Sequence, residues 1–413
     1  MNHRSRVYLI LSLLTISGFI LSPFQTLTQG LASHELPITL DLRLSSMMSI
    51  GTFFRSFTTT YLEELTMLIK KPLVFYKYVI DFGQALSLAS HNLFDPFHIS
   101  TMVPVSSVYV SGTIEEDTTW TKDNSPYVID GNLTVAPGVT LTIETGVIVK
   151  FDDGIGLTVN GILIAQGEEG DEIFFTSLKD DTVGSDTNGD GDASSPAPGD
   201  WSQIWINDGS EVALTHTTLR HGGHAGYGIL TAWYNSNSIS LQNVTLQLSA
   251  SHGIYAMEGS ILAISDSSVI DNVSHGIFLS KAQLTLQNST ISNNGDDGVY
   301  AHGHSSIIVL DSNEISNNGD NGVNAAGQVS LTGNIIHDNA NDGIELHIGQ
   351  DVPTSSITDN TIQDNARDAL FVYYDGGAGL PELTGNTFSG NGLDHGVGLG
   401  GHIGQDIDRK SVV

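Results

Sequence analysis

Along most of the chain, apolar and polar residues alternate at every second position. The pattern is clear between residues 133 and 175, where the apolar residues share odd positions: Leu133, Val135, Val139, Leu141, Ile143, Val147, Val149, Phe151, Ile155, Leu157, Val159, Leu163, Ala165, Ile173 and Phe175. A period of two places alternate side chains on opposite faces of an extended chain, so it predicts strands with one buried side. Turn residues interrupt the pattern at Pro137-Gly138, Gly146 and Gly167. The sequence therefore predicts an all-β body of short strands.

The second half of this body repeats itself. In each unit, an apolar residue is followed by a polar residue three positions on, an apolar residue five positions on, and an Asn eight positions on. The recurring residue is Asn272, Asn294, Asn318, Asn339, Asn365 or Asn391, with Ser249 in the first unit. A Gly follows in most units: Gly253, Gly276, Gly298, Gly322, Gly343 and Gly396, with Ala369 in one. The six intervals from Gly253 to Gly396 give a unit of about 24 residues.

A unit with two or three short strands cannot bury its apolar face alone. Coiling the units into a parallel β-solenoid pairs each strand with its copy one turn on, about 4.8 Å away. The recurring Asn then lies at the same bend in every coil, where its amide can bond to the next turn and build a structural ladder. We expect the recurring Gly to supply the unusual backbone of the turn.

Units such as ISDSSVIDNVSHGI, LQNSTISNNGDDGV and LTGNIIHDNANDGI resemble parallel β-helix repeats. Residues 106–405 resemble the right-handed parallel β-helix proteins of the pectin-lyase-like superfamily. Within them, the block TWTKDNSPYVIDGNLTVAPGVTLTIETGVIVKF is similar to the first coils of secreted bacterial β-helix surface proteins. The resemblance implies the fold and leaves the function open, because the superfamily includes polysaccharide lyases, hydrolases and epimerases as well as adhesins.

The N-terminal residues are typical of an export signal. Arg4 and Arg6 precede an uncharged apolar run from Val7 to Leu21, and Gly30-Leu31-Ala32 offers small residues to a signal peptidase. We expect residues 1–32 to be a signal peptide cleaved after Ala32. The alternative is an uncleaved anchor, although the run of 15 residues is shorter than the ~20 that span a bilayer. The protein is therefore expected to be extracellular, on the cell surface or periplasmic.

Residues 33–105 separate this signal from the body. Leu62, Leu65 and Leu68 fall at helical spacing before Pro72. We expect either a short helical leader that packs on the body or is poorly ordered, or a helical cap that covers the open end of the β structure. Residues 406–413 form a short tail after the last coil.

Charge restricts the class of partner. The chain has 413 residues with 46 Asp+Glu against 15 Lys+Arg, a formal net charge of −31, and almost all of the excess lies after residue 100. Neutralising phosphates requires Lys and Arg, so the balance excludes nucleic-acid binding and disfavours anionic membrane surfaces. We expect no membrane insertion beyond the signal segment. The chain has no Cys, which excludes disulfides and thiolate metal sites. The oligomeric state stays open.

An acidic insertion at residues 178–200 carries the most specific local motif. Asp186, Asn188, Asp190 and Asp192 place oxygen side chains at alternate positions, and Gly191 occupies the sixth position. This spacing lets one tight loop wrap a hard cation, and it resembles the first half of an EF-hand calcium loop. The twelfth position is Ala197 instead of a bidentate Glu. We expect a structural Ca²⁺ that braces the insertion; the alternative is a solvated acidic loop.

Alternation after each repeat Gly places one side chain per coil on an exposed sheet face. The outward residues include Tyr255, Phe278, Tyr300, Phe371 and Tyr373. Aromatic side chains bind sugar rings, and a rod with one site per coil suits a polysaccharide or a cell-surface glycan. The alternative is a cross-strand ladder that stabilises stacked coils.

The same face offers groups for acid–base chemistry. Tyr300, His302, Glu345 and His347 fall within about two coils of one another. His and Glu could act as base and acid, which would make the protein a calcium-dependent polysaccharide lyase, hydrolase or epimerase. No residue pattern matches a catalytic motif of the superfamily. The sequence therefore favours a carbohydrate-associated binding or structural module with a calcium-braced loop, with the enzyme as the alternative.

Overall fold

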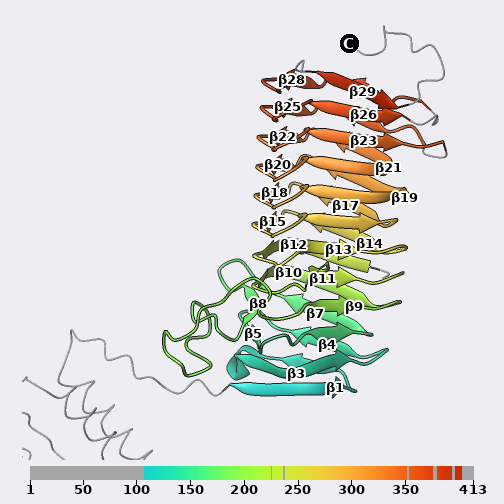
Figure 1. Ribbon diagram of the computed structural model, residues 1–413. Helices are drawn as coiled ribbons and strands as arrows, with labels where there is room; N and C mark the ends of the chain where they lie inside the picture. The colour runs from blue at the N-terminus through green and yellow to red at the C-terminus, as the bar shows by residue number, and fades with distance from the viewer. Residues whose placement is uncertain are drawn as a thin grey trace, which may run out of the picture. The chain divides into compact units, whose positions relative to one another are not determined.

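The computed structural model describes residues 107–224, 226–235, 238–350, 353–374, 379–392 and 396–401. Within these residues the chain is a right-handed parallel β-helix of about 12 turns (Figure 1). The predicted all-β solenoid is therefore confirmed. The predictions for residues 1–32, 33–105 and 406–413 lie outside the described residues. No helix within the described ranges is long and apolar enough to cross a membrane.

Each coil contributes strands to three parallel faces, which we call sheets I, II and III. Sheet I consists of β2 (Thr118–Trp120), β4 (Thr140–Ile143), β7 (Ile162–Gln166), β14 (Ile261–Ser265), β17 (Gln283–Gln287), β24 (Ser356–Thr358), β27 (Glu382–Thr384) and parts of β10 (Glu211–Arg220), β12 (Ser238–Gln247), β19 (Val299–Asp311) and β21 (Val323–Thr332). One 3-10 helix, η1 (Lys122–Asn124), follows β2.

Sheet II follows sheet I along each coil and has the shortest strands. It consists of β5 (Ile148–Phe151), β8 (Ile173–Ser177), β15 (Ser268–Ile270), β18 (Thr290–Ser292), β20 (Glu314–Ser316), β22 (Ile335–His337), β25 (Thr361–Gln363), β28 (Thr387–Ser389), the first halves of β1 (Val108–Ile114) and β3 (Tyr127–Val135), and the ends of β10 and β12.

Sheet III closes the coil. It consists of β6 (Leu157–Val159), β9 (Ile204–Ile206), β11 (Gly228–Ala232), β13 (His252–Ala256), β16 (Ile277–Ser280), β23 (Ile344–Ile348), β26 (Leu370–Tyr374), β29 (Val397–Gly401), the second halves of β1 and β3, and the first halves of β19 and β21.

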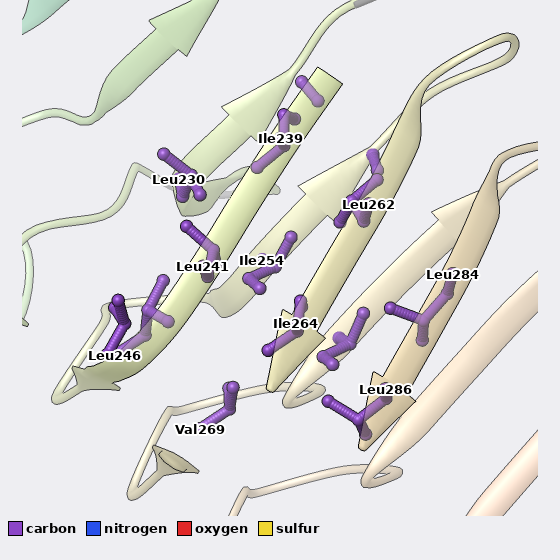
Figure 2. Packing of buried hydrophobic residues seen from close by; sticks show 14 of the residues in the cluster. Leu230, Ile239, Leu241, Leu246, Ile254, Leu262, Ile264, Val269, Leu284 and Leu286 are labelled. Atoms are coloured by element: carbon purple, nitrogen blue, oxygen red, sulfur yellow. The ribbon is translucent and has the colours of Figure 1, made fainter. Parts of the chain in front are cut away.

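The core is a stack of aliphatic side chains inside the coils. Figure 2 shows how Leu241, Ile264 and Leu286 repeat at one position of successive coils, each at most 2% exposed. On sheet III, Ile254, Ile277 and Val299 pair in register and are fully buried. Burial of each such side chain stabilises the fold by roughly 1.5–3 kcal/mol. The period of two in the sequence thus corresponds to the inward face of every strand.

The recurring Asn residues form a ladder at the corner between sheets II and III. The Nδ2 of each Asn donates to the Oδ1 of the Asn one coil on, at 2.9–3.0 Å, and also to a strand carbonyl of the coil before. Each Oδ1 also accepts the backbone N–H of the preceding rung. The rungs are Asn272, Asn294, Asn318, Asn339, Asn365 and Asn391, all at most 2% exposed. Every amide group in the ladder is therefore used.

A second Asn ladder, which the sequence analysis did not identify, lies at the corner between sheets I and II. Asn313, Asn334 and Asn360 donate in sequence to Asn334, Asn360 and Asn386, at 2.9–3.0 Å. The earlier coils place Ser267 and Ser289 at this corner. The residue before each rung of both ladders has a left-handed backbone where the coil turns, as in Asn317 (φ 55°) and Ser312 (φ 60°). Asn, Asp and Gly tolerate that conformation best, which explains their abundance here.

The repeat Gly has a different role from the predicted one. Gly276, Gly298 and Gly343 are absent from the residues with positive φ, so they supply no left-handed turn. Instead, a Cβ at Gly276 would lie 2.8 Å from Asn294 Nδ2 and 2.7 Å from the carbonyl oxygen of Gly298. The same approach recurs at Gly298 and Gly343. Gly fits this position because the backbone passes directly against the ladder amide, and the one coil that departs carries the small residue Ala369.

Replacing a central rung tests how much the ladder contributes to stability. In Asn318→Ala, Asn294 loses an acceptor while Asn339 Oδ1 and the Ile291 carbonyl lose a donor. Each buried group left unpaired costs about 1–3 kcal/mol, so we expect the free energy of unfolding to fall by at least ~2 kcal/mol in urea unfolding. Ser240→Ala, on the exposed face of β12, is the control. Equal stability of the two variants would show that the ladder contributes nothing.

Candidate functional site

Aromatic residues follow one another along the outer face of sheet III. Strand register places Trp205, Thr231, Tyr255, Phe278 and Tyr300 on successive coils. Further rings flank them, and the ring contacts are continuous from Trp205 to Tyr300. We call this the aromatic stripe; it consists of Trp205, Tyr227, Trp233, Tyr234, Tyr255, Phe278 and Tyr300.

The middle of the stripe is a stack. The Tyr255 and Phe278 rings lie 4.7 Å apart and 8° from parallel, and Tyr300 stacks on His275 at 4.7 Å and 8°. Rings stacked along the helix axis cover each other's faces and turn their edges outward. Such pairs contribute about 0.5–1.5 kcal/mol beyond their burial. These rings therefore join neighbouring coils, and they offer a sugar mainly edges and hydroxyl groups.

The N-terminal end of the stripe is arranged differently. Tyr227 meets Trp205 edge-on at 5.3 Å and Tyr255 at 5.4 Å, and Trp233 meets Tyr234 at 83°. Tyr234 is 42% exposed. The sequence analysis missed this cluster, although Trp205 stands between Ile204 and Ile206 in the same alternating pattern. The repeat pattern can be recognised only from residue 241 onward, and Tyr227 and Tyr234 come from the segments that flank β11.

A hollow of about 140 Å³ lies beside Trp205. Its lining comes from β3, β6, β9 and the residues just before β6 and β9, and it carries no charge: Asn132, Gly156, Leu157, Thr158, Ser202, Gln203 and Trp205. The indole is held in place, because its Nε1 donates to Asn207 Oδ1 at 2.8 Å and Asn207 donates to Asn160 at 2.7 Å. One fixed indole with amide and hydroxyl groups around it can bind a small polar ring.

Further along sheet III, the acid–base candidates lie on two strands, β19 and β23, with β21 between them. Glu345 Oε1 is 3.0 Å from His347 Nε2, while Oε2 accepts from Asn321 at 3.2 Å and Asn324 at 3.4 Å. The bond to His347, which outweighs the effect of burial, lowers the pKa of Glu345. Tyr300 is two register steps away, with Asn324 between, and its ring lies 6.4 Å from that of His302. Burial raises the pKa of Tyr300, as do Asp297 and Asp296.

The remaining predicted ring positions lie beyond this group. Phe371 pairs in register with Glu345, and Tyr373 pairs with His347, whose ring lies 5.7 Å away. Asn324 and Glu345 therefore separate Phe371 from Tyr300 along the register. The five aromatic positions taken from the sequence share one sheet face but form two separate groups.

The insertion at residues 178–200 leaves the helix between β8 and β9 (Figure 1). Asp186 Oδ1 accepts from the amides of Gly189 and Asp190, and Oδ2 accepts from Gly191. Oxygens of Asp181, Asp186 and Asp190 approach within 4.8 Å of one another. Asn188 donates to Asp190 at 2.9 Å, and the exposed Asp192 is outside this group of carboxylates. The approach of Asp181 could not be foreseen from the spacing of the loop.

A buried ion pair anchors this insertion to the helix. Asp180 is fully buried, and its Oδ2 lies 2.6 Å from Arg220 Nη2 and 2.6 Å from Thr176 Oγ1. Burial acts to raise the pKa of Asp180, but the hydrogen bonds from Thr176 and Thr182 and the charge of Arg220 together lower it. Trp201 closes the insertion by stacking on Phe151 at 4.2 Å.

Stacked histidines beside the stripe make stability depend on pH. Burial, together with neighbouring His275, lowers the pKa of His252 from 6.5 to about 4, and its side chain is 7% exposed. Between these values the unfolded chain binds a proton that the folded chain does not. The neutral His252 side chain therefore contributes its full stabilisation above pH 6.5. As the pH falls from 6.5 to about 4, the free energy of unfolding decreases by on the order of 3 kcal/mol.

His252→Asn should flatten this part of the pH dependence, because Asn321 occupies the equivalent position three coils on and does not titrate. Urea unfolding of both proteins between pH 4 and 7 measures the difference. If the free energy of unfolding had the same pH dependence in the two proteins, His252 would not be its source.

Three comparisons place the chain among known proteins. The family model "Right handed beta helix region" matches residues 200–312 and 279–404. The crystal structure of the periplasmic alginate epimerase AlgG aligns over 65% of this chain and 78% of that chain, with 15% identity and a TM-score of 0.45. The A-module of mannuronan C-5 epimerase AlgE6 from Azotobacter vinelandii aligns over 72% and 89%, with 17% identity and a TM-score of 0.37.

Among curated proteins, Protein bark beetle of Drosophila melanogaster is 33% identical over 94 residues. That segment is 23% of this chain and 3% of the fly protein, so the chain spans only a small part of that relative. The family match covers the coils that carry both Asn ladders, and the strands of those coils pair in parallel around one core. The chain is therefore a right-handed parallel β-helix repeat protein.

Proposed function

We propose that this β-helix is an exported carbohydrate-binding module whose primary site is the hollow beside Trp205. The hollow supports the proposal because it combines a fixed indole with amide and hydroxyl groups and carries no charge. Sugars present apolar faces and hydroxyl groups, so they match such a lining. An uncharged lining favours a neutral sugar ring at this position. The apolar run of the export signal supports a location outside the cytoplasm.

The stacked middle of the stripe extends this site along the helix axis. Tyr255 and Tyr300 present edges and hydroxyl groups to a chain that leaves the hollow, while their stacking maintains the spacing of the coils. A polymer that lies along sheet III would meet one side chain every ~4.8 Å. We therefore propose a polysaccharide or a long oligosaccharide as the ligand.

A catalytic role is the second candidate, because Glu345 and His347 are already hydrogen-bonded at 3.0 Å. A carboxylate that orients an imidazole can make it a general base, as a polysaccharide lyase, hydrolase or epimerase requires. In this case a polysaccharide that binds at Trp205 would extend along sheet III to Glu345 and His347. Release of unsaturated or reducing ends from a bound polysaccharide, lost in Glu345→Gln, would favour the enzyme over the binding module.

Removing the indole tests the binding site. We expect Trp205→Ala to weaken retention on immobilised neutral polysaccharides by about tenfold or more, because the hollow loses its aromatic wall. Trp205→Phe keeps a ring and should retain part of the affinity. Tyr109→Ala is the control, since this ring is 58% exposed on another face of the helix. Unchanged retention in Trp205→Ala, or an equal loss in Tyr109→Ala, would contradict the proposed site.

We also propose that the insertion binds Ca²⁺ through Asp186, Asn188, Asp190 and the additional carboxylate of Asp181. Oxygen groups at this density suit a hard cation. Asp181 Oδ1 is enclosed and lacks a hydrogen-bond partner within the described part of the chain, and burial followed by Asp186 raises the pKa of Asp181. The Lys150 ammonium group donates to the Ser185 carbonyl at 2.9 Å, and its charge partly offsets that of Asp181, whose pKa it acts to lower. Net negative charge remains at the loop.

Thermal unfolding with and without calcium tests this site. At a calcium concentration 100-fold above the dissociation constant, we expect about 2.7 kcal/mol of added stability and a corresponding rise in Tm. Asp190→Asn keeps the shape of the side chain and should abolish the rise. Asp208→Asn removes an equal charge from a turn outside the insertion and should retain it. A rise that persists in Asp190→Asn, or no rise in the native protein, would exclude this loop as a calcium site.

A further inference from the structure

Carboxylates gather on sheet III directly after the aromatic stripe ends. We call Asp296, Asp297, Asp320, Asp342 and Glu345 the acidic patch. The corner before the sheet III strands provides the four aspartates from three successive coils, where the Asp320 amide donates to the Asp296 carbonyl and the Asp342 amide donates to Asn321 Oδ1. Glu345 follows on β23, one coil beyond Asn324 and two coils beyond Tyr300.

The patch has a buried row and an accessible row. Asp297 and Asp342 are 2% and 1% exposed, and each accepts the backbone N–H of the next coil through Oδ1, from Asn321 and Asp368. Asp296, Asp320 and Glu345 reach the surface, with 42% of the Asp296 side chain exposed. The buried row fixes the backbone, and the accessible row presents its negative charge to solvent.

These carboxylates are close enough to perturb each other. Burial raises the pKa of Asp320, even against its hydrogen bond from Asn341, and Asp297, Asp296 and Glu345 raise it further. Positive charge nearby is limited: Arg367 lies 3.7 Å from Asp342, and His275 and His347 contact Asp296 and Glu345. His252, on the stripe side, has a pKa of about 4 and adds no charge at neutral pH. The surface therefore has an unbalanced negative charge.

The acidic patch and the uncharged hollow lie on one continuous sheet face. Register connects Trp205 to Glu345 through Thr231, Tyr255, Phe278, Tyr300 and Asn324. Six coil steps of ~4.8 Å give a separation of about 29 Å. A polymer anchored in the hollow and directed along the helix would therefore reach the carboxylates, which a short ligand in the hollow would not.

We propose that the ligand is a polymer of amino sugars, whose ammonium groups contact the acidic patch while the ring of one sugar occupies the hollow through its apolar face and hydroxyl groups. This inference rests on the proposed function and specifies the chemical class of its ligand. Ammonium groups complement the accessible carboxylates of Asp296, Asp320 and Glu345, whereas uronate polymers would be repelled by them. The patch thus selects between glycans that the hollow alone would bind equally.

A metal ion is a less suitable occupant of the patch. His275, Asp296 and Asp297 approach within 4.8 Å, but the two carboxylates lie at opposite nitrogens of one imidazole, Asp296 at Nε2 and Asp297 at Nδ1. His275 Nδ1 also accepts the backbone N–H of Asp297 at 3.1 Å. Because Nδ1 already accepts this hydrogen bond, only Nε2 remains to ligate an ion, and the carboxylate in contact with Nε2 is that of Asp296.

A matched pair of ligands tests the inference: hexamers of glucosamine and of N-acetylglucosamine, which differ in charge and in the acetyl group. At mildly acidic pH and ~0.1 M salt, isothermal titration should show the glucosamine hexamer binding at least tenfold more tightly. The preference should fall below threefold at ~1 M salt. A chelator should have no effect, and a uronate hexamer should bind more weakly than either.

Variants of the acidic patch and of the hollow test these two parts of the surface separately. Asp296→Asn with Asp320→Asn should remove most of the preference for glucosamine while leaving affinity for the N-acetylated hexamer within twofold. Trp205→Ala should weaken binding of both hexamers. Equal affinity for the two hexamers in the native protein, or a preference that survives the double variant or disappears with chelator, would overturn the inference while the hollow remained a glycan site. No binding of any glycan would overturn the proposed function itself.

Discussion

Parallel stacking in register is the constraint on which the structure depends. Each strand pairs with its equivalent one turn on, so each side chain lies against the residue at the same position of the next coil. The side chains at one position of successive coils form a column. Such a column is stable when each side chain interacts favourably with a neighbour of the same kind. Amides satisfy this condition because they both donate and accept, aliphatic groups because they pack, and aromatic rings because they stack. Carboxylates repel their copies: Asn321 stands between Asp297 and Asp342 in the buried column, and where Asp368 follows Asp342 directly, the Asp368 amide donates to Asp342 Oδ1.

This constraint explains which parts of the structure could be predicted from the sequence. The alternation and the recurring Asn indicated the solenoid, because equivalent positions carry equivalent residues. The second ladder was missed because its first rungs are Ser267 and Ser289, which obscure the column of Asn residues that follows. The sequence analysis assigned the repeat Gly to an unusual turn, and this prediction was wrong. A close approach of the backbone to an amide also selects Gly, so the sequence alone does not distinguish the two roles.

The site was less accessible to prediction, for physical reasons. Trp205 belongs to a coil with a long insertion, so its register with Tyr255 follows only from the strand pairing. Asp180 and Arg220 are 40 residues apart and meet through the stacking of coils of unequal length. The alternation did place Tyr255, Phe278 and Tyr300 on one face, but it did not indicate that their rings would cover each other. The orientation of the rings distinguishes the two parts of the stripe: stacked rings join neighbouring coils, whereas the rings near Trp205 meet edge-on.

The position of the insertion has an evolutionary consequence. Residues 178–200 leave the helix at the corner where later coils carry the first Asn ladder, and both ladders run only through coils after it. The hollow is lined by β3, β6, β9 and the residues just before β6 and β9, all of which precede the ladder units. Duplication or loss of a whole coil among the ladder units would therefore change the length of the rod without disturbing the hollow or the insertion. The two ends of the described helix can therefore diverge separately, with one keeping the hollow and the insertion while the other changes in length.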